Sequence, residues 1–279
     1  MTTRNVTRII RSHASKDGDG VKINRVHGFN DAKFSPFLLV DELKSENPDD
    51  YIGGFPPHPH RGIETLTYML TGHFQHRDHM GNVGELKTGG AQWMSAGKGV
   101  IHSEMPIMSE GGLHGFQIWI NLPAAKKMNP AQYHDFQTEE INEYGSNKNL
   151  LRVISGNLTE NGDALTGPLQ KTGVETVVAD WRANEGETRR LNISERYQVN
   201  LFVYRGDIDV EGTTVPQGHF AQLSAGETIS LTAQKKAGVL ILAGEPINEP
   251  VVHYGPFVMN TMEEINQAMR DYENGVLTD

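Results

Sequence analysis

The sequence predicts an all-β protein made of two similar halves. Apolar and polar residues alternate along short segments such as 116–122 (FQIWINL) and 197–204 (YQVNLFVY), and a period of two is typical of strands with one buried face. Glycine-containing turns separate such segments about every 8–12 residues, which is the spacing of a β-sandwich or β-barrel. Helical periodicity is scarce, so few helices are expected.

The segments within each half are short strands joined by tight turns. In the first half, 65–70 (TLTYML) is followed by a glycine turn. In the second half, 197–204 ends at the turn 205–207 (RGD), and 208–212 (IDVEG) is its expected hairpin partner. The segment 239–243 (VLILA) is continuously apolar, which is typical of a short buried strand.

The expected domain organisation follows from a polar divide. The stretch 138–147 (TEEINEYGSN) is polar, and strand-rich regions at 50–125 and 190–245 lie on either side of it. A chain of 279 residues is long enough for one or two compact cores. We therefore expect one domain at 1–135 and a second at 136–279.

One clear helix is expected, in the C-terminal tail over residues 261–274. Thr261 and Glu264 have the spacing of a capping box, in which each side chain binds the backbone N–H of the other residue. Apolar residues then follow every three or four positions up to Gly275: Met262, Ile265, Ala268, Met269 and Tyr272. This apolar face is expected to pack the tail helix back onto a domain.

The composition argues against several classes of function. The formal net charge is −10 and there is no long run of Lys or Arg. This argues against direct nucleic-acid binding, which requires a basic face, and leaves a small-molecule ligand or a protein partner open. Residues 1–20 lack the apolar core of a signal peptide, and no window approaches the roughly 18 apolar residues of a membrane span. We therefore expect a cytoplasmic protein with no membrane segment.

Any metal would be bound by histidines and carboxylates, because the chain contains no cysteine. Eight of the 12 histidines lie between His58 and His134. Beyond them only His219 and His253 follow, and neither has a partner at ligand spacing. If the two halves are related domains, the sequence predicts a metal-ligand set in the first and none in the second.

Two pairs of residues have the spacing of metal ligands on strands. His58 and His60 form one pair, and His102 and Glu104 form the other. Residues i and i+2 project from the same face of a strand, so two such pairs on neighbouring strands converge on one point. A single pair would also be compatible with a surface coincidence, and the second pair argues against that interpretation. The sequence therefore predicts one mononuclear metal site.

This ligand set would be reactive. Three neutral imidazoles and one carboxylate leave coordination positions open for water, substrate or dioxygen, unlike the closed cage of a structural zinc. Fe(II), Mn, Ni, Cu, Co and Zn all accept such ligands. Glycines that precede both pairs, Gly53 and Gly54 before the first and Gly97 and Gly99 before the second, allow close backbone approach.

Three long motifs resemble the pirin family of the cupin superfamily. The first is GFPPHPHRGIETLTYMLTG from Gly54, which is followed by His76-Arg77-Asp78 and then by GGAQWMSAGKGVIHSEMP. The tail, GEPINEPVVHYGPFVMNTMEEINQAMRDYENG, is similar to the C-terminal signature of the family. Less distinctive strands lie between these motifs, so the resemblance covers nearly the whole chain.

The resemblance implies a bicupin, that is, two stacked cupin β-barrels with metal in the N-terminal barrel only. It implies that the metal is iron in most members and that the ligands fall on His58, His60, His102 and Glu104. The wider cupin superfamily has its carboxylate ligand a few residues after the first histidine pair, where this chain has Glu64. The pirin pattern uses Glu104 instead, so Glu64 is interpreted as a strand residue that makes a polar contact behind the ligands. A role of Glu64 as a ligand is the alternative.

The resemblance also implies a choice of functions. Some pirins resemble quercetin 2,3-dioxygenases, which open a flavonol with O2 and release CO, and Glu104 would then be the general base as well as a ligand. A small aromatic substrate and O2 would be the partners of such an enzyme. Other family members are nuclear cofactors, which implies a metal- or redox-sensing protein that binds a protein partner. A sugar- or small-acid-modifying cupin, which needs metal but not O2, is the third hypothesis.

Further residues near the predicted site have both a functional and a structural interpretation. Arg61 would either meet an anionic substrate or pair with a carboxylate. His73, His76 and His79 are interpreted as a turn and the start of a strand, and His76 is a candidate to orient a ligand through a hydrogen bond. His114 is expected to be a satisfied polar residue.

Large apolar side chains are expected to form the core or the wall of a substrate pocket. The candidates for this role are Trp93, Met94 and Trp119. In the tail motif, packing of the chain back onto a barrel is the favoured interpretation of Glu249, Tyr254 and Phe257.

Overall fold

The computed structural model describes residues 2–29, 31–108 and 111–279, and it divides the chain into two compact units. The histidine-rich unit comprises Ala14–Asn30, Phe37–Thr138 and Ile247–Asp279. The second unit comprises Met1–His13, Asp31–Pro36 and Glu139–Pro246. The chain passes from one unit to the other at residues 138/139, close to the expected boundary. A single boundary does not describe the division, however. Two short N-terminal segments belong to the second unit, and the C-terminal tail belongs to the histidine-rich unit.

Packing within each unit explains this interleaving. The N-terminal strand β1 (Val6–Arg11) pairs antiparallel with β22 (His219–Leu223), so β1 forms an edge strand of a sheet of the second unit. The 3-10 helix η1 (Ala32–Phe34) brings Phe34 edge-on to Phe220, with ring centroids 5.1 Å apart. In the tail, Phe257 and Ile265 share a buried apolar cluster that belongs to the histidine-rich unit.

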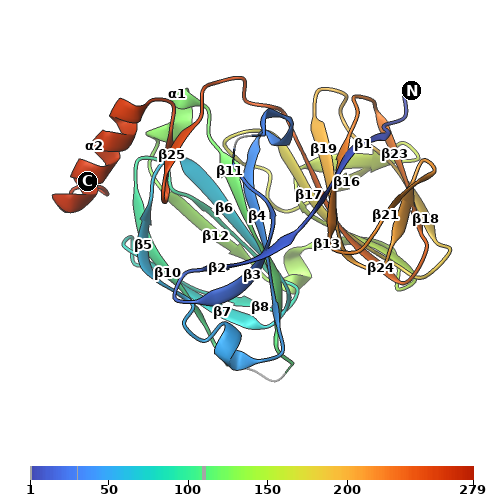
Figure 1. Cartoon of the computed structure of the whole chain (residues 1–279), viewed down its shortest axis with the longest axis horizontal. Coiled ribbons are helices and arrows are strands. Elements are labelled where there is room, and N and C mark those ends of the chain that lie inside the picture. Colours follow the sequence, from blue (N-terminus) through green and yellow to red (C-terminus); the bar gives the residue numbers. More distant parts are fainter. Residues whose placement is uncertain (1, 30, 109–110) are drawn as a thin grey trace. The chain divides into compact units, whose positions relative to one another are not determined.

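Two large antiparallel sheets form the body of the histidine-rich unit (Figure 1). The larger has seven strands in the order β12 (Gln132–Phe136), β9 (Ala91–Ser95), β6 (Ile63–Thr71), β11 (Leu113–Asn121), β4 (Phe37–Ser45), β3 (Val21–His27) and β2 (His13–Asp17). The smaller has four, in the order β5 (Phe55–His60), β10 (Val100–Pro106), β7 (His73–Asp78) and β8 (Val83–Lys87). Short helices η2 (Pro48–Asp50) and α1 (Ala124–Lys127) connect strands.

The second unit also consists of two antiparallel sheets. The seven-stranded sheet has the order β1, β22, β19 (Gln198–Arg205), β24 (Ala237–Gly244), β17 (Thr176–Ala183), β14 (Asn149–Ser155) and β13 (Asn142–Ser146). The six-stranded sheet has the order β16 (Asp163–Thr166), β15 (Asn157–Glu160), β18 (Thr188–Asn192), β23 (Thr228–Ala233), β20 (Ile208–Val210) and β21 (Thr213–Val215). The 3-10 helix η3 (Thr138–Glu140) lies at the change of unit.

The two sheets of each unit share an apolar core, as in a jelly-roll sandwich. In the second unit, the core joins Val177 and Leu201 of the seven-stranded sheet to Leu191 and Leu231 of the six-stranded sheet. The prediction of an all-β fold with two cupin-type domains is confirmed. The described sheets face each other as sandwich layers and are not hydrogen-bonded into closed barrels.

One predicted hairpin is wrong. Residues 208–212 were expected to pair with 197–204, but β20 pairs with β21 and β23, whereas β19 pairs with β22 and β24. The turn at 205–207 therefore carries the chain from one sheet to the other. Alternation of apolar residues sets which face of a strand is buried, and Ile208 and Val210 fill the shared core equally well from the second sheet.

The tail forms the hairpin β25 (Val252–Tyr254) and β26 (Phe257–Met259), followed by α2 (Met262–Glu273). Figure 1 shows α2 beside β25 at one end of the histidine-rich unit. The predicted capping box is confirmed, because Glu264 N donates to Thr261 Oγ1 at 3.2 Å and Thr261 N donates to Glu264 Oε2 at 2.9 Å. Met262 and Tyr272 were expected on the buried face and are instead exposed.

Among the described residues, no helix is long and apolar enough to span a bilayer.

Candidate metal centre

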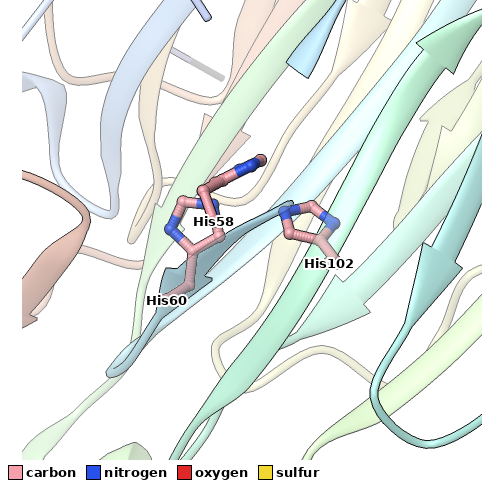
Figure 2. A group of neighbouring side chains, drawn as sticks. All are labelled: His58, His60 and His102. Carbon is pink, nitrogen blue, oxygen red and sulfur yellow. The ribbon is translucent and has the colours of Figure 1, made fainter. Parts of the chain in front are cut away.

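Strands β5 and β10 bring the three predicted imidazoles together. The strands pair antiparallel, with His102 directly opposite His58, and the alternation of β5 places His60 on the same face as His58. One nitrogen from each ring lies within 4.8 Å of the others, and no other such group of three occurs among the described residues. Figure 2 shows the three rings turned towards one another.

Hydrogen bonds fix which nitrogen of each ring is protonated. The Nδ1 atoms of His58 and His60 lie 2.8 Å from the carbonyl oxygen of Pro56 and 3.2 Å from that of Pro256. A carbonyl oxygen only accepts, so both Nδ1 atoms donate. In each neutral ring, Nε2 therefore keeps its lone pair for a metal ion.

His102 is also protonated on Nδ1, and a second histidine, His76, determines this. His76 Nε2 lies 3.1 Å from Asp78 Oδ2 and therefore donates to it. This leaves the His76 Nδ1 atom as an acceptor for His102 Nδ1, which lies 3.4 Å away. The Nε2 atom of His102 then carries the lone pair, and it is buried with no hydrogen-bond partner among the described residues.

Burial keeps these rings neutral. His60 and His102 are each 2% exposed. Desolvation lowers the pKa of all three imidazoles, and it lowers the pKa of His60 to about 3. A neutral imidazole is the form that binds a metal. The cluster is thus prepared to bind a cation at neutral pH.

The packing around His76 holds its ring in place. Its ring stacks on Tyr133 with centroids 4.2 Å apart and an interplanar angle of 19°. Asn82 Nδ2 donates to Asp78 at 2.8 Å. Although burial opposes ionisation, the hydrogen bonds from Asn82 and His76 lower the pKa of Asp78. The expectation that His76 orients a ligand through a hydrogen bond agrees with this arrangement.

Glu104 lies beside the imidazoles but outside the group of three. Its carboxylate lies 3.1 Å from Thr67 Oγ1 and 3.5 Å from Gln117 Nε2. Burial raises its pKa to about 7, although the hydrogen bond from Thr67 opposes that rise. Glu104 therefore lies where it can exchange a proton near neutral pH.

The cluster opens into a cavity of about 630 Å³, which is within the usual range for small-molecule sites. His58, His60 and Glu104 contribute to its lining. Its apolar walls come from Ile23, Phe29, Leu39, Leu43, Phe55 and Trp119. The cavity thus has the imidazoles on one side and apolar walls around them.

The three large side chains that were expected in the core or in the pocket wall divide between these two places. Trp119 lines the cavity and meets His60 edge-on, with ring centroids 5.0 Å apart. Met94 packs in the apolar cluster that Trp119 joins. Trp93 lies on the opposite face of β9 from Met94, because successive strand residues alternate. Trp119 therefore belongs to the pocket wall, whereas Trp93 and Met94 are buried in the core.

Glu64 and Arg61 do not line the cavity. Glu64 and Thr67 are three positions apart on β6, so their side chains lie on opposite faces of the sheet. Because Thr67 contacts Glu104, the carboxylate of Glu64 points away from the site. Of the two roles expected for Arg61, pairing with a carboxylate is the one observed. Arg61 Nη1 donates to Asp271 Oδ2 at 2.6 Å and Nη2 donates to the Leu277 carbonyl at 3.1 Å.

The other histidines have separate surroundings. His73 and His76 are three residues apart on β7 and so point to opposite faces. His114 Nε2 donates to Glu42 Oε1 at 2.8 Å, as expected for a satisfied polar residue. His253, which has no partner at ligand spacing in the sequence, lines the cavity and stacks on Phe29 with centroids 3.9 Å apart.

Several polar residues of the site were missed by the sequence interpretation. Thr67 and Gln117 hold Glu104, and Arg25 and Asp41 line the cavity. A polar residue at an inward position of an otherwise buried strand is the signal that would have identified Thr67 and Gln117. Buried residues occupy both faces of β6, so its sequence did not reveal which face was inward.

Two jelly-roll units, one of which gathers three imidazoles beside a cavity, define the class of the bicupins. A Pirin family model matches residues 20–120, and the model of the Pirin C-terminal cupin domain matches residues 178–278. The chain belongs to the pirin family. The resemblance noted in the sequence motifs is thereby confirmed.

Relatives match over almost their whole length. A Vibrio cholerae protein, provisionally named a quercetin 2,3-dioxygenase, is 59% identical over 273 residues, which cover 98% of this chain and 97% of the relative. The crystal structure of a quercetin 2,3-dioxygenase from Acinetobacter baumannii has a TM-score of 0.90 at 32% identity, covering 99% of this chain and 98% of that chain. A bacterial pirin from Escherichia coli, solved with nickel(II), shares the fold with a TM-score of 0.65 at 22% identity, covering 86% and 100%.

Proposed function

We propose that this pirin is an iron-dependent dioxygenase that opens a flavonol such as quercetin with O2 and releases CO. The observation that carries the proposal is the set of three neutral imidazoles, each with a free Nε2 lone pair, beside a cavity with aromatic walls. The names of the relatives described above agree with this reaction.

The donor set fits one divalent metal ion. His102 Nε2 is a buried acceptor without a partner among the described residues, and a metal ion would satisfy it. Glu104 is proposed as the fourth ligand, since its buried carboxylate lies beside the histidines and a nearby cation would favour its ionised form. When bound, the ion would act as a Lewis acid that lowers the pKa of a substrate hydroxyl and would provide a site for O2.

The residues of the cavity would orient the substrate. Trp119 and Phe29 meet edge-on with ring centroids 5.9 Å apart, and Phe55 lies on the same cavity. These rings offer apolar faces on which a flat flavonol can pack. Their packing also excludes water from the reacting atoms, which protects a deprotonated substrate from the solvent.

Glu104 would accept the proton of the flavonol 3-hydroxyl. A general base must lie within reach of the proton that it accepts, and Glu104 lines the same cavity as His58 and His60. Thr67 and Gln117 hold the carboxylate through the contacts described above. In the overall reaction, both atoms of O2 enter the opened product and one ring carbon leaves as CO, so no further oxidant is needed.

The test is turnover by protein of known metal content. The protein would be purified without added metal, analysed for elements, and loaded anaerobically with Fe(II), Mn, Ni, Co, Cu or Zn. We expect loss of flavonol absorbance with one O2 consumed and one CO released per quercetin. His102→Ala should abolish turnover, and the matched control His219→Gln, in the second unit, should leave it unchanged.

Two outcomes would count against the proposal. A protein with one iron per chain that consumes no O2 with quercetin is not this enzyme. If that protein still binds quercetin, the metal-sensing regulatory hypothesis would replace the dioxygenase. Isomerisation of a sugar or small acid without O2 would favour the third hypothesis.

A further inference from the structure

A row of polar side chains crosses the inner face of the seven-stranded sheet. Arg25 of β3 pairs with Asp41 of β4, Asp41 pairs with Gln117 of β11, and Gln117 pairs with Thr67 of β6. Directly opposed residues of neighbouring strands have side chains on the same face. The row therefore runs from the two residues that contact Glu104 to Arg25.

This row gives the cavity a second polar end. The strands of Gln117 and Arg25 are two spacings apart, which corresponds to about 10 Å. Arg25, Asp41 and Gln117 all line the cavity that His58 and His60 reach. A planar ligand of two or three rings can span that distance, with one edge at the imidazoles and the other at Arg25.

Apolar residues lie on both sides of the polar row. Leu39 pairs with Trp119 on one side, and Leu43 with Ile23 on the other. All four line the cavity. The cavity thus offers two apolar surfaces for ring faces and a narrow polar strip for groups on the ring edge, which is the pattern that a flat hydroxylated aromatic presents.

Contacts with two carboxylates determine what Arg25 can bind. Its Nε and Nη2 atoms donate to Asp41 at 2.8 Å and 2.6 Å, and Nη2 also donates to Asp17 at 3.0 Å. The Nη1 atom makes no hydrogen bond with the described residues. Nη1 therefore has protons to donate to a ligand, and Asp17, whose side chain is 50% exposed, has an oxygen that can accept.

The charges at this end favour a neutral ligand group. One guanidinium and two carboxylates give a net charge of −1. A ligand carboxylate or phosphate would be repelled by Asp17 and Asp41, because like charges at close range are unfavourable. A hydroxyl can instead accept from Arg25 and donate to Asp17 at the same time.

We propose that Arg25 and Asp17 bind a ring hydroxyl of a neutral, planar, polyhydroxylated aromatic ligand and reject a carboxylated one. Arg25 is in this sense a specificity-determining residue at the end of the cavity away from the metal centre. The inference rests on the proposed function in assigning this cavity to the substrate. It adds the residues that would recognise a substrate hydroxyl far from the metal-binding edge.

The test compares three ligands by anaerobic calorimetry on the metal-loaded full-length protein, so that no turnover is needed. The ligands are quercetin, 3-hydroxyflavone, which has no other hydroxyl, and a flavonol that carries a carboxylate in place of a ring hydroxyl. The variants are Arg25→Met and Asp17→Asn. Lys22→Met is the matched control, because Lys22 lies on the same strand, pairs with Asp50 and does not line the cavity.

Arg25→Met should weaken quercetin binding by about tenfold, the usual effect of losing a hydrogen bond from a charged group, and should leave 3-hydroxyflavone almost unaffected. Asp17→Asn should tighten binding of the carboxylated flavonol, because it removes a repelling charge. The second variant matters because Arg25→Met leaves the buried Asp41 without its cation and can destabilise the fold. Lys22→Met should change none of these affinities.

Equal losses for quercetin and 3-hydroxyflavone, or an unchanged carboxylated flavonol with Asp17→Asn, would overturn the inference. Failure of this inference and failure of the proposed dioxygenase function would give different results. Binding of quercetin that depends on Arg25 without O2 uptake would support the inference and reject the dioxygenase. Turnover of quercetin, together with binding that neither Arg25→Met nor Asp17→Asn changes, would support the dioxygenase and reject the inference.

Discussion

The imidazole of His60 donates its Nδ1 proton to the backbone carbonyl of Pro256, which lies 196 positions later in the chain, across 3.2 Å. The tail therefore sets the tautomer of a predicted metal ligand. Gly62 permits this approach, since a Cβ atom at that position would lie 2.0 Å from the carbonyl oxygen of Val258. The organisation of the metal centre therefore depends on the attachment of the tail to β5.

Asp271→Asn should loosen that attachment. Asp271 accepts from Arg61, whose side chain is 5% exposed, at 2.6 Å, and Arg61 directly follows His60. The amide keeps the shape but loses the charge-assisted hydrogen bond, so the free energy of unfolding should fall by about 2 kcal/mol. Urea denaturation would measure it, with Glu273→Gln in the exposed last turn of α2 as the control. Equal stability of the two variants would contradict this role for the ion pair.

Lys127→Met should have a larger effect at the same junction. The buried ammonium donates to the Gly62 carbonyl at 2.8 Å, the Val258 carbonyl at 3.0 Å and Asn121 Oδ1 at 2.7 Å. Methionine fills the space but leaves three acceptors without a donor, which should cost about 3 kcal/mol or more. Denaturation would be compared with Lys126→Met, a change at the exposed neighbour in α1, which should be nearly neutral. A stable Lys127→Met protein that still binds iron tightly would contradict the coupling of tail and metal site.

The ligand strands were predictable because their information is local. The i, i+2 spacing of His58 and His60, and of His102 and Glu104, fixes which side chains share a face, and antiparallel pairing of β5 with β10 then brings them together. The capping box of α2 is equally local. Fold class and the three-histidine cluster therefore followed from short-range pattern and family motifs.

The rest of the site depends on long-range pairing. Arg25 reaches the cavity only because β3 lies two strands from β11, and no spacing in the sequence encodes that neighbour relationship. His253 had no partner at ligand spacing, and its contact with Phe29 requires the tail to return to the histidine-rich unit. The expected hairpin at 208–212 was wrong for the same reason, since alternation does not state which sheet a strand joins.

In the metal-free protein, the contribution of Glu104 to stability should be lost as the pH rises through about 7. Burial raises the pKa of Glu104 from 4.5 to about 7, so the folded state binds a proton that the unfolded state has released. The contribution is fully present below pH 4.5 and is lost as the pH rises through about 7, amounting to about 3 kcal/mol. Glu104→Gln lacks this dependence, so its stability relative to wild type should increase with pH in urea denaturation from pH 5 to 8.

Metal loading should reverse the pH dependence of the difference in stability between Glu104→Gln and wild type. A bound cation favours the ionised carboxylate and neutral imidazoles, so the wild-type protein should gain stability from metal as the pH rises, because protons then compete less for the ligands. Glu104→Gln should gain less from the same metal concentration. Parallel pH profiles for the two proteins, with and without metal, would contradict the assignment of Glu104 to the site.

Asp78→Asn tests the hydrogen bonds behind His102. The Asp78 carboxylate accepts from His76 Nε2 at 3.1 Å and thereby makes His76 Nδ1 the acceptor for His102. An amide can present its NH2 group to His76 and favour the opposite tautomer, which would leave the lone pair of His102 on the wrong nitrogen. Loss of such a supporting carboxylate typically lowers metal affinity by about 10- to 100-fold.

Competition with a chelator would measure the change in metal affinity, and Glu85→Gln, on the neighbouring strand β8, is the control. If Asp78→Asn retains iron as tightly as that control does, the hydrogen bonds that His58 and His60 donate to the Pro56 and Pro256 carbonyls are enough to organise the centre. His76 would then serve only to pack against Tyr133.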